Sequence, residues 1–150
     1  MKKIAVLLFV VSALFACSKD KFKTVPQIEI KSFGPNVVHN KETFSLRAII
    51  RDKEGDLKDT ITFYRKYFNG ATMVKQDSFL KYNLDNFGFP EHDQIEVQLL
   101  FSYGEDRSPT YLLQNTELND RDLVIGIIVK DKAGNRSEYV ETDRITLKKP

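Results

Sequence analysis

The chain has 150 residues, 41% of them hydrophobic and 29% charged, which suits one domain with a sizeable core. Its 23 basic and 21 acidic residues give a formal net charge of only +2, so we expect no nucleic-acid partner. The aromatic residues are 11 Phe and 6 Tyr with no Trp, a set that favours β-strands.

Residues 1–16 have the features of an export signal. Lys2 and Lys3 give a basic start, and the apolar run over residues 4–15 is shorter than the roughly 20 residues of a membrane-spanning helix. We therefore predict a signal peptide helix over residues 1–16 that is removed on export. Its removal would leave 21 basic and 21 acidic residues, which again argues against nucleic-acid binding.

Leu14-Phe15-Ala16-Cys17 resembles a bacterial lipobox, with a small residue directly before the single cysteine of the chain. The resemblance implies cleavage before Cys17 and its lipidation, with residues 17–25 as lipidated cysteine and polar tether. Two or more acyl chains anchor a protein stably, whereas one is marginal. By analogy with lipoprotein sorting in Gram-negative bacteria, Ser18 points to the outer membrane. It does not specify whether the domain lies on the periplasmic or the surface side of that membrane. The alternative is a secretory signal with an incidental cysteine.

Residues 26–150 are predicted to form one all-β domain, because apolar and polar residues alternate with the period of a half-buried strand. The predicted strands cover residues 26–33, 42–52, 60–68, 72–79, 94–103, 123–129 and 137–147. Asn69-Gly70 is a strong hairpin signal, and a phase change near residues 141–143 indicates a β-bulge. About seven strands separated by turns predict an immunoglobulin-like, two-sheet antiparallel sandwich.

Residues 123–129 form the most apolar segment of the mature chain. Leu123 and Ile125 share one face of the predicted strand, and Val124 and Gly126 lie on the other. Because both faces are apolar, we predict a central strand that is covered on both sides. Residues 80–93, by contrast, show no regular alternation of apolar and polar residues and are predicted to be a long loop.

Two acidic turns repeat one pattern, Asp-Lys-X-Gly-Asp/Asn, at residues 52–56 and 131–135. In such turns Asp accepts bonds from nearby backbone N–H groups and Gly allows positive φ. The apolar strand and the Asp-Lys-Ala-Gly-Asn-Arg-Ser that follows it, over residues 124–137, resemble the end of many bacterial immunoglobulin-like or fibronectin III-like domains. With the lipobox, early turn and long loop, the chain resembles small single-domain lipoproteins of Bacteroidota, a family of largely unknown function. Glu54 departs from their early turn, which has Asp there.

If the two turns are neighbours at one end of the sandwich, they offer a cluster of hard oxygen ligands, as Ca²⁺ prefers. The candidate ligands are Asp52, Glu54, Asp56, Asp131 and Asn135. The alternative is two hairpin turns with self-capping carboxylates. Lys53 and Lys132 within the turns favour that alternative, as does the lack of an EF-hand loop. Ca²⁺ is the one cofactor that the sequence suggests.

Aromatic residues gather in and before the predicted long loop. Phe79, Tyr82, Phe87 and Phe89 would form either a platform for a sugar or protein partner or a plug for the open edge of the sandwich. His39 and His92 are far apart in sequence and lack metal-type partners, so we interpret both as surface residues.

The chain contains no nucleophile elbow, zinc motif, phosphate-binding loop or dinucleotide fingerprint. We therefore predict a lipid-anchored, non-catalytic binding or structural module of the cell envelope. Its expected partners are the membrane and an envelope protein or glycan. Two alternatives are a Ca²⁺- or glycan-binding surface lipoprotein and a small hydrolase with two carboxylates across a pocket.

Overall fold

The computed structural model describes residues 25–87, 93–114 and 118–150, and the predicted signal peptide and Cys17 lie outside these ranges. Within them the chain forms ten strands and one short 3₁₀ helix, η1 (Leu84–Phe87). The strands are β1 (Gln27–Gly34), β2 (Val37–Val38), β3 (Thr43–Arg51), β4 (Thr60–Asn69), β5 (Thr72–Asn83), β6 (Gln94–Tyr103), β7 (Tyr111–Leu113), β8 (Arg121–Lys130), β9 (Val140–Glu141) and β10 (Ile145–Leu147).

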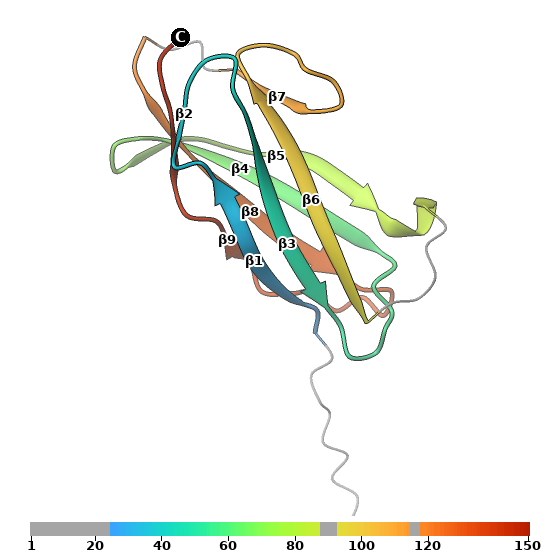
Figure 1. The fold of residues 1–150 in the computed structure, drawn as a ribbon. Helices are drawn as coiled ribbons and strands as arrows, with labels where there is room; N and C mark the ends of the chain where they lie inside the picture. The colour runs from blue at the N-terminus through green and yellow to red at the C-terminus, as the bar shows by residue number, and fades with distance from the viewer. Residues whose placement is uncertain (1–24, 88–92, 115–117) are drawn as a thin grey trace, which may run out of the picture.

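The strands form two sheets that pack face to face (Figure 1). The four-stranded sheet has the order β1-β3-β6-β7, and the six-stranded sheet has the order β2-β10-β8-β4-β5, with β9 also paired to β8. β3 and β4 follow each other in sequence but lie in different sheets, so residues 52–59 cross between them. The predicted all-β, immunoglobulin-like two-sheet sandwich is confirmed.

Three details of the prediction are wrong. The described residues form ten strands instead of about seven, because the last predicted strand is split and two short strands, β2 and β7, are added. Two short pairings, β2 with β10 and β6 with β7, are parallel, although all pairings between long strands are antiparallel as predicted. β5 continues to Asn83 where a loop was predicted, since Leu80 and Tyr82 keep alternating and pair with β4. In the described residues, no helix has the length and apolarity to cross a membrane.

The core lies between the facing surfaces of the two sheets. On β3 the inward side chains are buried and the alternate ones are wholly or partly exposed, as the period of two predicts. The same alternation supplies buried side chains from β4, β6 and β8, each contributing about 1.5–3 kcal/mol through its burial. The largest fully buried side chains of β3, β4, β6 and β8 are Leu46, Ile50, Ile61, Phe63, Phe101, Tyr103, Leu123, Ile125 and Ile127.

The outward face of β8 is covered by a local segment and not by a third layer. Gly126 is buried there, and a Cβ at this position would overlap the ring and hydroxyl of Tyr139. Tyr139 precedes β9, which pairs with β8, and the Nζ of Lys66 lies 4.9 Å from the centre of its ring. The prediction that β8 is central and covered on both sides is therefore confirmed.

The predicted bulge lies where β9 gives way to β10. Gly126 is opposite Glu141 whereas Leu123 is opposite Ile145, so one extra residue is inserted on the C-terminal side. Thr142 fills the interruption, since its Oγ1 accepts a 3.0 Å hydrogen bond from the backbone nitrogen of Ile125.

The contact between Gly126 and Tyr139 predicts a steric coupling. Gly126→Ala should lower the free energy of unfolding by about 1–3 kcal/mol, because the new Cβ must displace the ring. In a Tyr139→Ala background the same change should cost less than half as much. Urea denaturation of the wild type, both single variants and the double variant measures the coupling. Equal costs in the two backgrounds would contradict the packing described here.

Candidate cation site

The two acidic turns meet at one end of the sandwich, as the sequence suggested. Asp52 follows the last residue of β3 and Asp131 follows the last residue of β8, so each sheet contributes one turn. The turns are bonded to each other directly, since the backbone nitrogen of Lys132 donates to the carbonyl of Asp56 at 3.2 Å. The first turn links two sheets instead of two paired strands, so the hairpin interpretation holds only for the second turn, which joins β8 to β9.

The first turn is closed by its own aspartate. The backbone nitrogen of Glu54 donates to Oδ1 of Asp52 at 3.2 Å, and Gly55 donates to the carbonyl of Asp52 at 3.3 Å. Gly55 has φ 70°, a conformation that glycine adopts without a steric cost. This geometry leaves Oδ2 of Asp52 without a donor from its own turn and directs the carboxylate into the protein.

The second turn is closed more tightly. Asn135 donates to Asp131 twice, from its backbone nitrogen to Oδ1 at 2.7 Å and from its side-chain amide to Oδ2 at 2.8 Å. Gly134 has φ 91° and donates to the carbonyl of Asp131 at 3.1 Å. Asn135 thus orients the Asp131 carboxylate, and each of its oxygens keeps a second lone pair for another partner.

Three carboxylates converge where the turns meet. Asp52, Asp56 and Asp131 each place an oxygen within 4.8 Å of the oxygens of the other two. Asp52 is 2% exposed and Asp131 is fully buried. Oδ2 of Asp52 and Oδ1 of Asp56 are buried and accept no hydrogen bond from the described residues. Buried acceptors without donors are costly, and a proton, a cation or a buried water would satisfy them.

The pKa of Asp52 is also unusually high for an aspartate. Burial raises the pKa of Asp52 to about 6 from its ordinary 3.8, and the neighbouring carboxyl groups of Asp56 and Asp131 add to the rise. A shift of this size corresponds to about 3 kcal/mol lost when Asp52 ionises in the folded protein. At neutral pH the group is an ionised carboxylate held in unfavourable surroundings, which is the condition that a bound cation reverses.

The other predicted site residues lie apart from this group. The Glu54 side chain is exposed and is not among the three convergent carboxylates, and Asn135 acts on the group through Asp131. Tyr82 packs edge-on against Phe63 and its hydroxyl bonds to that of Tyr111. Phe79 packs against Phe101. The rings of Phe79 and Tyr82 therefore lie at the edge of the core, as expected if they plug the open edge of the sandwich. Phe87 lies at the end of η1, and Phe89 and His92 lie outside the described residues.

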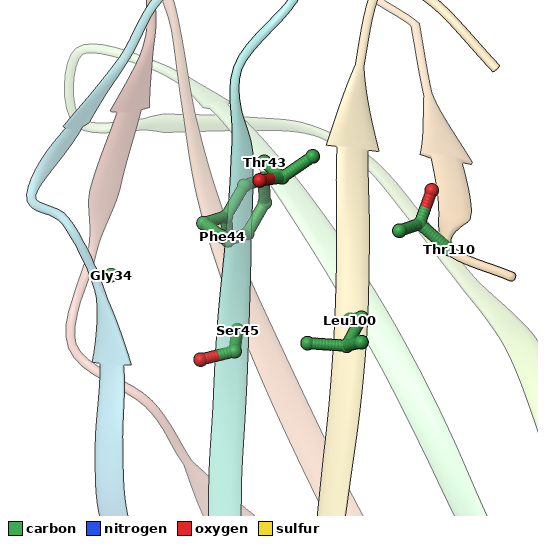
Figure 2. A pocket seen from close by; sticks show the side chains of 6 residues that line it. All are labelled: Gly34, Thr43, Phe44, Ser45, Leu100 and Thr110. Atoms are coloured by element: carbon green, nitrogen blue, oxygen red, sulfur yellow. The ribbon is translucent and has the colours of Figure 1, made fainter. Parts of the chain in front are cut away.

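A pocket of about 360 Å³ lies on the outer face of the four-stranded sheet (Figure 2). It forms beside Leu100 because the neighbours in the same row, Gly34 and Ser45, are small. Its remaining lining residues are Thr43, Phe44 and Thr110, so it contains no carboxylate. The paired carboxylates that a small hydrolase needs are therefore absent from this pocket.

A second pocket lies on the outer face of the six-stranded sheet and was not predicted. It brings together Lys81, Lys130 and Arg136 from three separate segments. These residues are distant in sequence, and the only signal for their association is the strand pairing, which a single sequence does not reveal.

No protein-family model matches the chain, and no curated protein matches it. Among solved structures, a β-glucosidase from Listeria innocua in complex with gluconolactone is 10% identical over 82% of this chain, with a TM-score of 0.44, and the chain spans 16% of it. Spo0M, a sporulation control protein from Bacillus subtilis, is 9% identical over 84% of the chain and half of its own length, with a TM-score of 0.42. The CARDB domain of PF1109 from Pyrococcus furiosus, in complex with di-metal ions, is 10% identical over 81% of the chain and 86% of its own, with a TM-score of 0.28. At these TM-scores, no ligand or activity carries over to this chain.

The raised pKa of Asp52 predicts a pH dependence in metal-free protein. A carboxyl whose pKa is about 6 when folded and 3.8 otherwise stabilises the fold below pH 4, and this contribution is lost as pH rises through 6. Asp52→Asn cannot ionise, so its free energy of unfolding relative to the wild type should rise by up to about 3 kcal/mol between pH 4 and pH 7.5. Urea denaturation in EDTA measures this difference.

Comparison with Glu54→Gln provides the control, because Glu54 lies in the same turn but is exposed. Carboxylates outside this three-residue group titrate alike in both proteins and cancel in the difference. A difference between Asp52→Asn and the wild type that stays constant across this pH range would contradict the electrostatic description of the site.

Proposed function

We propose that this protein is a lipid-anchored module of the cell envelope, non-catalytic, whose immunoglobulin-like domain binds Ca²⁺ where its two sheets meet. One observation carries the binding function: three carboxylates converge, and two of their buried oxygens have no hydrogen-bond donor. An acidic cluster alone would not suffice, since exposed acidic groups often gather without a ligand. Here the Asp52 and Asp131 side chains are buried, and the unpartnered oxygens, Oδ2 of Asp52 and Oδ1 of Asp56, are shielded from bulk solvent.

The ligand set favours a hard cation. Three carboxylates provide oxygen atoms and no nitrogen or sulfur, which suits Ca²⁺ or Mg²⁺ and disfavours zinc. Ca²⁺ tolerates irregular coordination and takes six to eight oxygens at about 2.3–2.6 Å, whereas Mg²⁺ demands a near-ideal octahedron. Because the three carboxylates come from two turns of different strands, an adaptable cation fits them better. Water would complete the coordination.

A bound cation would join the two layers of the sandwich. Asp52 and Asp56 belong to the crossing segment after β3, and Asp131 follows β8 of the other sheet. The cation would replace carboxylate repulsion by attraction at a point where the backbone nitrogen of Lys132 donates a 3.2 Å hydrogen bond to the carbonyl of Asp56. Since Asp52 must be ionised to bind it, affinity should weaken below about pH 6.

The anchor rests on the N-terminal sequence. Lys2, Lys3 and the apolar run before Ala16-Cys17 support export and lipidation. Gln27, at the start of β1, pairs with Arg51, which directly precedes Asp52. The tether would therefore leave the domain at the end that contains the cation site, and this end would lie nearest the membrane.

Ca²⁺ should stabilise the purified protein. At a free Ca²⁺ concentration 100-fold above Kd, the stabilisation is about 2.7 kcal/mol, or about 10 °C in Tm for a domain of this size. Asp52→Asn and Asp56→Asn should each remove most of this shift, because each deletes a carboxylate whose buried oxygen is without a donor. Differential scanning calorimetry with Ca²⁺, with Mg²⁺ and with EDTA makes the measurement.

Glu54→Gln serves as the matched variant. It removes one negative charge from the same turn but leaves the three convergent carboxylates intact, so its Ca²⁺ shift should equal that of the wild type. Equal loss in all three variants would mean that Ca²⁺ responds to general surface charge, and no shift in the wild type would overturn the proposed binding function. A larger shift with Mg²⁺ than with Ca²⁺ would contradict the choice of ion.

If Cys17 is lipidated, the Cys17→Ser substitution should move the protein from the membrane fraction to the soluble fraction. Cells grown with a labelled fatty acid should incorporate it into the wild-type protein and not into Cys17→Ser, and the wild type should sediment with membranes. Immunoblotting of soluble and membrane fractions completes the test. A processed wild-type protein without label in the soluble fraction would refute the anchor and leave the cation site untouched.

A further inference from the structure

A second pocket, of about 170 Å³, lies on the outer face of the six-stranded sheet. Its floor consists of two rows of cross-strand neighbours. Thr62 on β4 stands between Lys81 on β5 and Ile128 on β8, and Thr60 is paired with Lys130. Arg136, from the hairpin that follows β8, adjoins Lys130 at the side of the pocket.

The pocket has an excess of positive charge. Of its three cationic side chains, only Lys130 has an ion-pair partner, with its Nζ 2.8 Å from Oδ2 of Asp59. Asp59 also accepts a 2.6 Å hydrogen bond from the hydroxyl of Thr60, and these two bonds lower its pKa, so it stays ionised at neutral pH. In the part of the chain that the structure describes, Lys81 and Arg136 form no ion pair, and the lining as a whole has three cations and one carboxylate, a net charge of about +2.

Two of these cations are placed against each other. Lys130 and Arg136 are directly opposite in an antiparallel bridge, where side chains on one face are about 4.5–5.5 Å apart at Cβ. Like charges in this position destabilise a sheet. Asp59, which also lines the pocket, pairs with Lys130 and interacts electrostatically with Lys81. One carboxylate faces three cations, and an anion between Arg136, Lys130 and Lys81 would relieve the remaining repulsion.

We propose that this pocket binds a phosphate-type oxyanion. Arg136 offers a planar pair of donors that suits two oxygens of a tetrahedral anion, and Lys81 offers a point charge from the opposite wall. Thr62, which pairs with Lys81 and lines the same pocket, offers its hydroxyl as a neutral donor. This chemistry selects phosphate or sulfate groups over neutral sugars. The proposal does not depend on Ca²⁺ binding, because none of these residues belongs to the three-carboxylate group.

The anion has two possible sources. The pocket lies near the end of the domain where Gln27 begins β1, since Thr60 is paired with Lys130, the last residue of β8. If the tether holds this end near a membrane, the phosphate of a lipid headgroup is within reach. Otherwise the ligand is a soluble phosphate ester, including that of a phosphorylated glycan.

The test uses the Cys17→Ser protein, which has no acyl chain to insert into membranes, in EDTA to separate the result from Ca²⁺ binding. Glucose 6-phosphate is titrated while the backbone amide NMR signals of Thr62, Lys130 and Arg136 are followed. Vesicles of phosphatidylglycerol and of phosphatidylcholine are compared in a sedimentation assay. The Lys81→Gln, Arg136→Gln double variant should bind about tenfold more weakly or worse, having lost two charged donors.

The control is a Lys75→Gln, Arg107→Gln double variant, which removes the same charge from exposed positions outside the pocket. It should retain binding within about twofold. Binding of glucose 6-phosphate alone assigns the site to soluble esters, and binding of phosphatidylglycerol vesicles assigns it to lipid headgroups, provided that the pocket variant loses either one. If neither probe binds, or if both double variants lose binding equally, the proposal is overturned.

Discussion

Alternate side chains of β8 occupy opposite faces of one strand, and this alternation organises the rest of the domain. Leu123, Ile125, Ile127 and Val129 fill the core, while Val124, Gly126 and Ile128 face outward, where Tyr139 covers Gly126 and Ile128 lines the outer pocket. At the strand end the same alternation separates charge. Lys130 lies in the outer pocket, and the next residue, Asp131, is buried among carboxylates. One backbone path thus fixes two sites of opposite sign because successive side chains point in opposite directions.

Much of this could be predicted from sequence, because local signals determined it. The alternation in β3 and β6 places Phe44, Leu46, Leu99 and Phe101 in the core, and the repeated turn pattern identified two acidic turns that would form a cluster if they shared one end, as they do. Local signals fail where the outcome depends on strand pairing. The prediction ends β5 too early because the adjacent apolar residues Phe79 and Leu80 break the alternation, and the register shift in the β4–β5 pairing that accommodates them is visible only in the structure. The position of Glu54 was also beyond prediction, since the turn closed by Asp52 leaves its side chain exposed. The cationic pocket was missed entirely because it depends on which strands adjoin β4.

The acidic site shows how a tight fold accommodates an unfavourable group. Asp52 and Asp131 use backbone and side-chain bonds to close their turns, so replacing either one by an apolar residue would lose the turn along with the charge. The same burial that makes the turns rigid raises the pKa of Asp52 and leaves two oxygens without donors. Burial therefore supplies both the structural role of these carboxylates and their capacity to bind a cation.

The two proposed sites are linked through the hairpin after β8. Residues 131–135 close the turn through the bonds between Asp131 and Asn135, and this closure brings Arg136 opposite Lys130. A cation that holds the Asp131 carboxylate would restrain the turn and so restrain Arg136 in the outer pocket. An anion in that pocket would relieve the repulsion between Arg136 and Lys130 and favour the same closed hairpin. Ligands of opposite charge would then stabilise one conformation from opposite faces of the strand end, and by linkage each would strengthen the binding of the other.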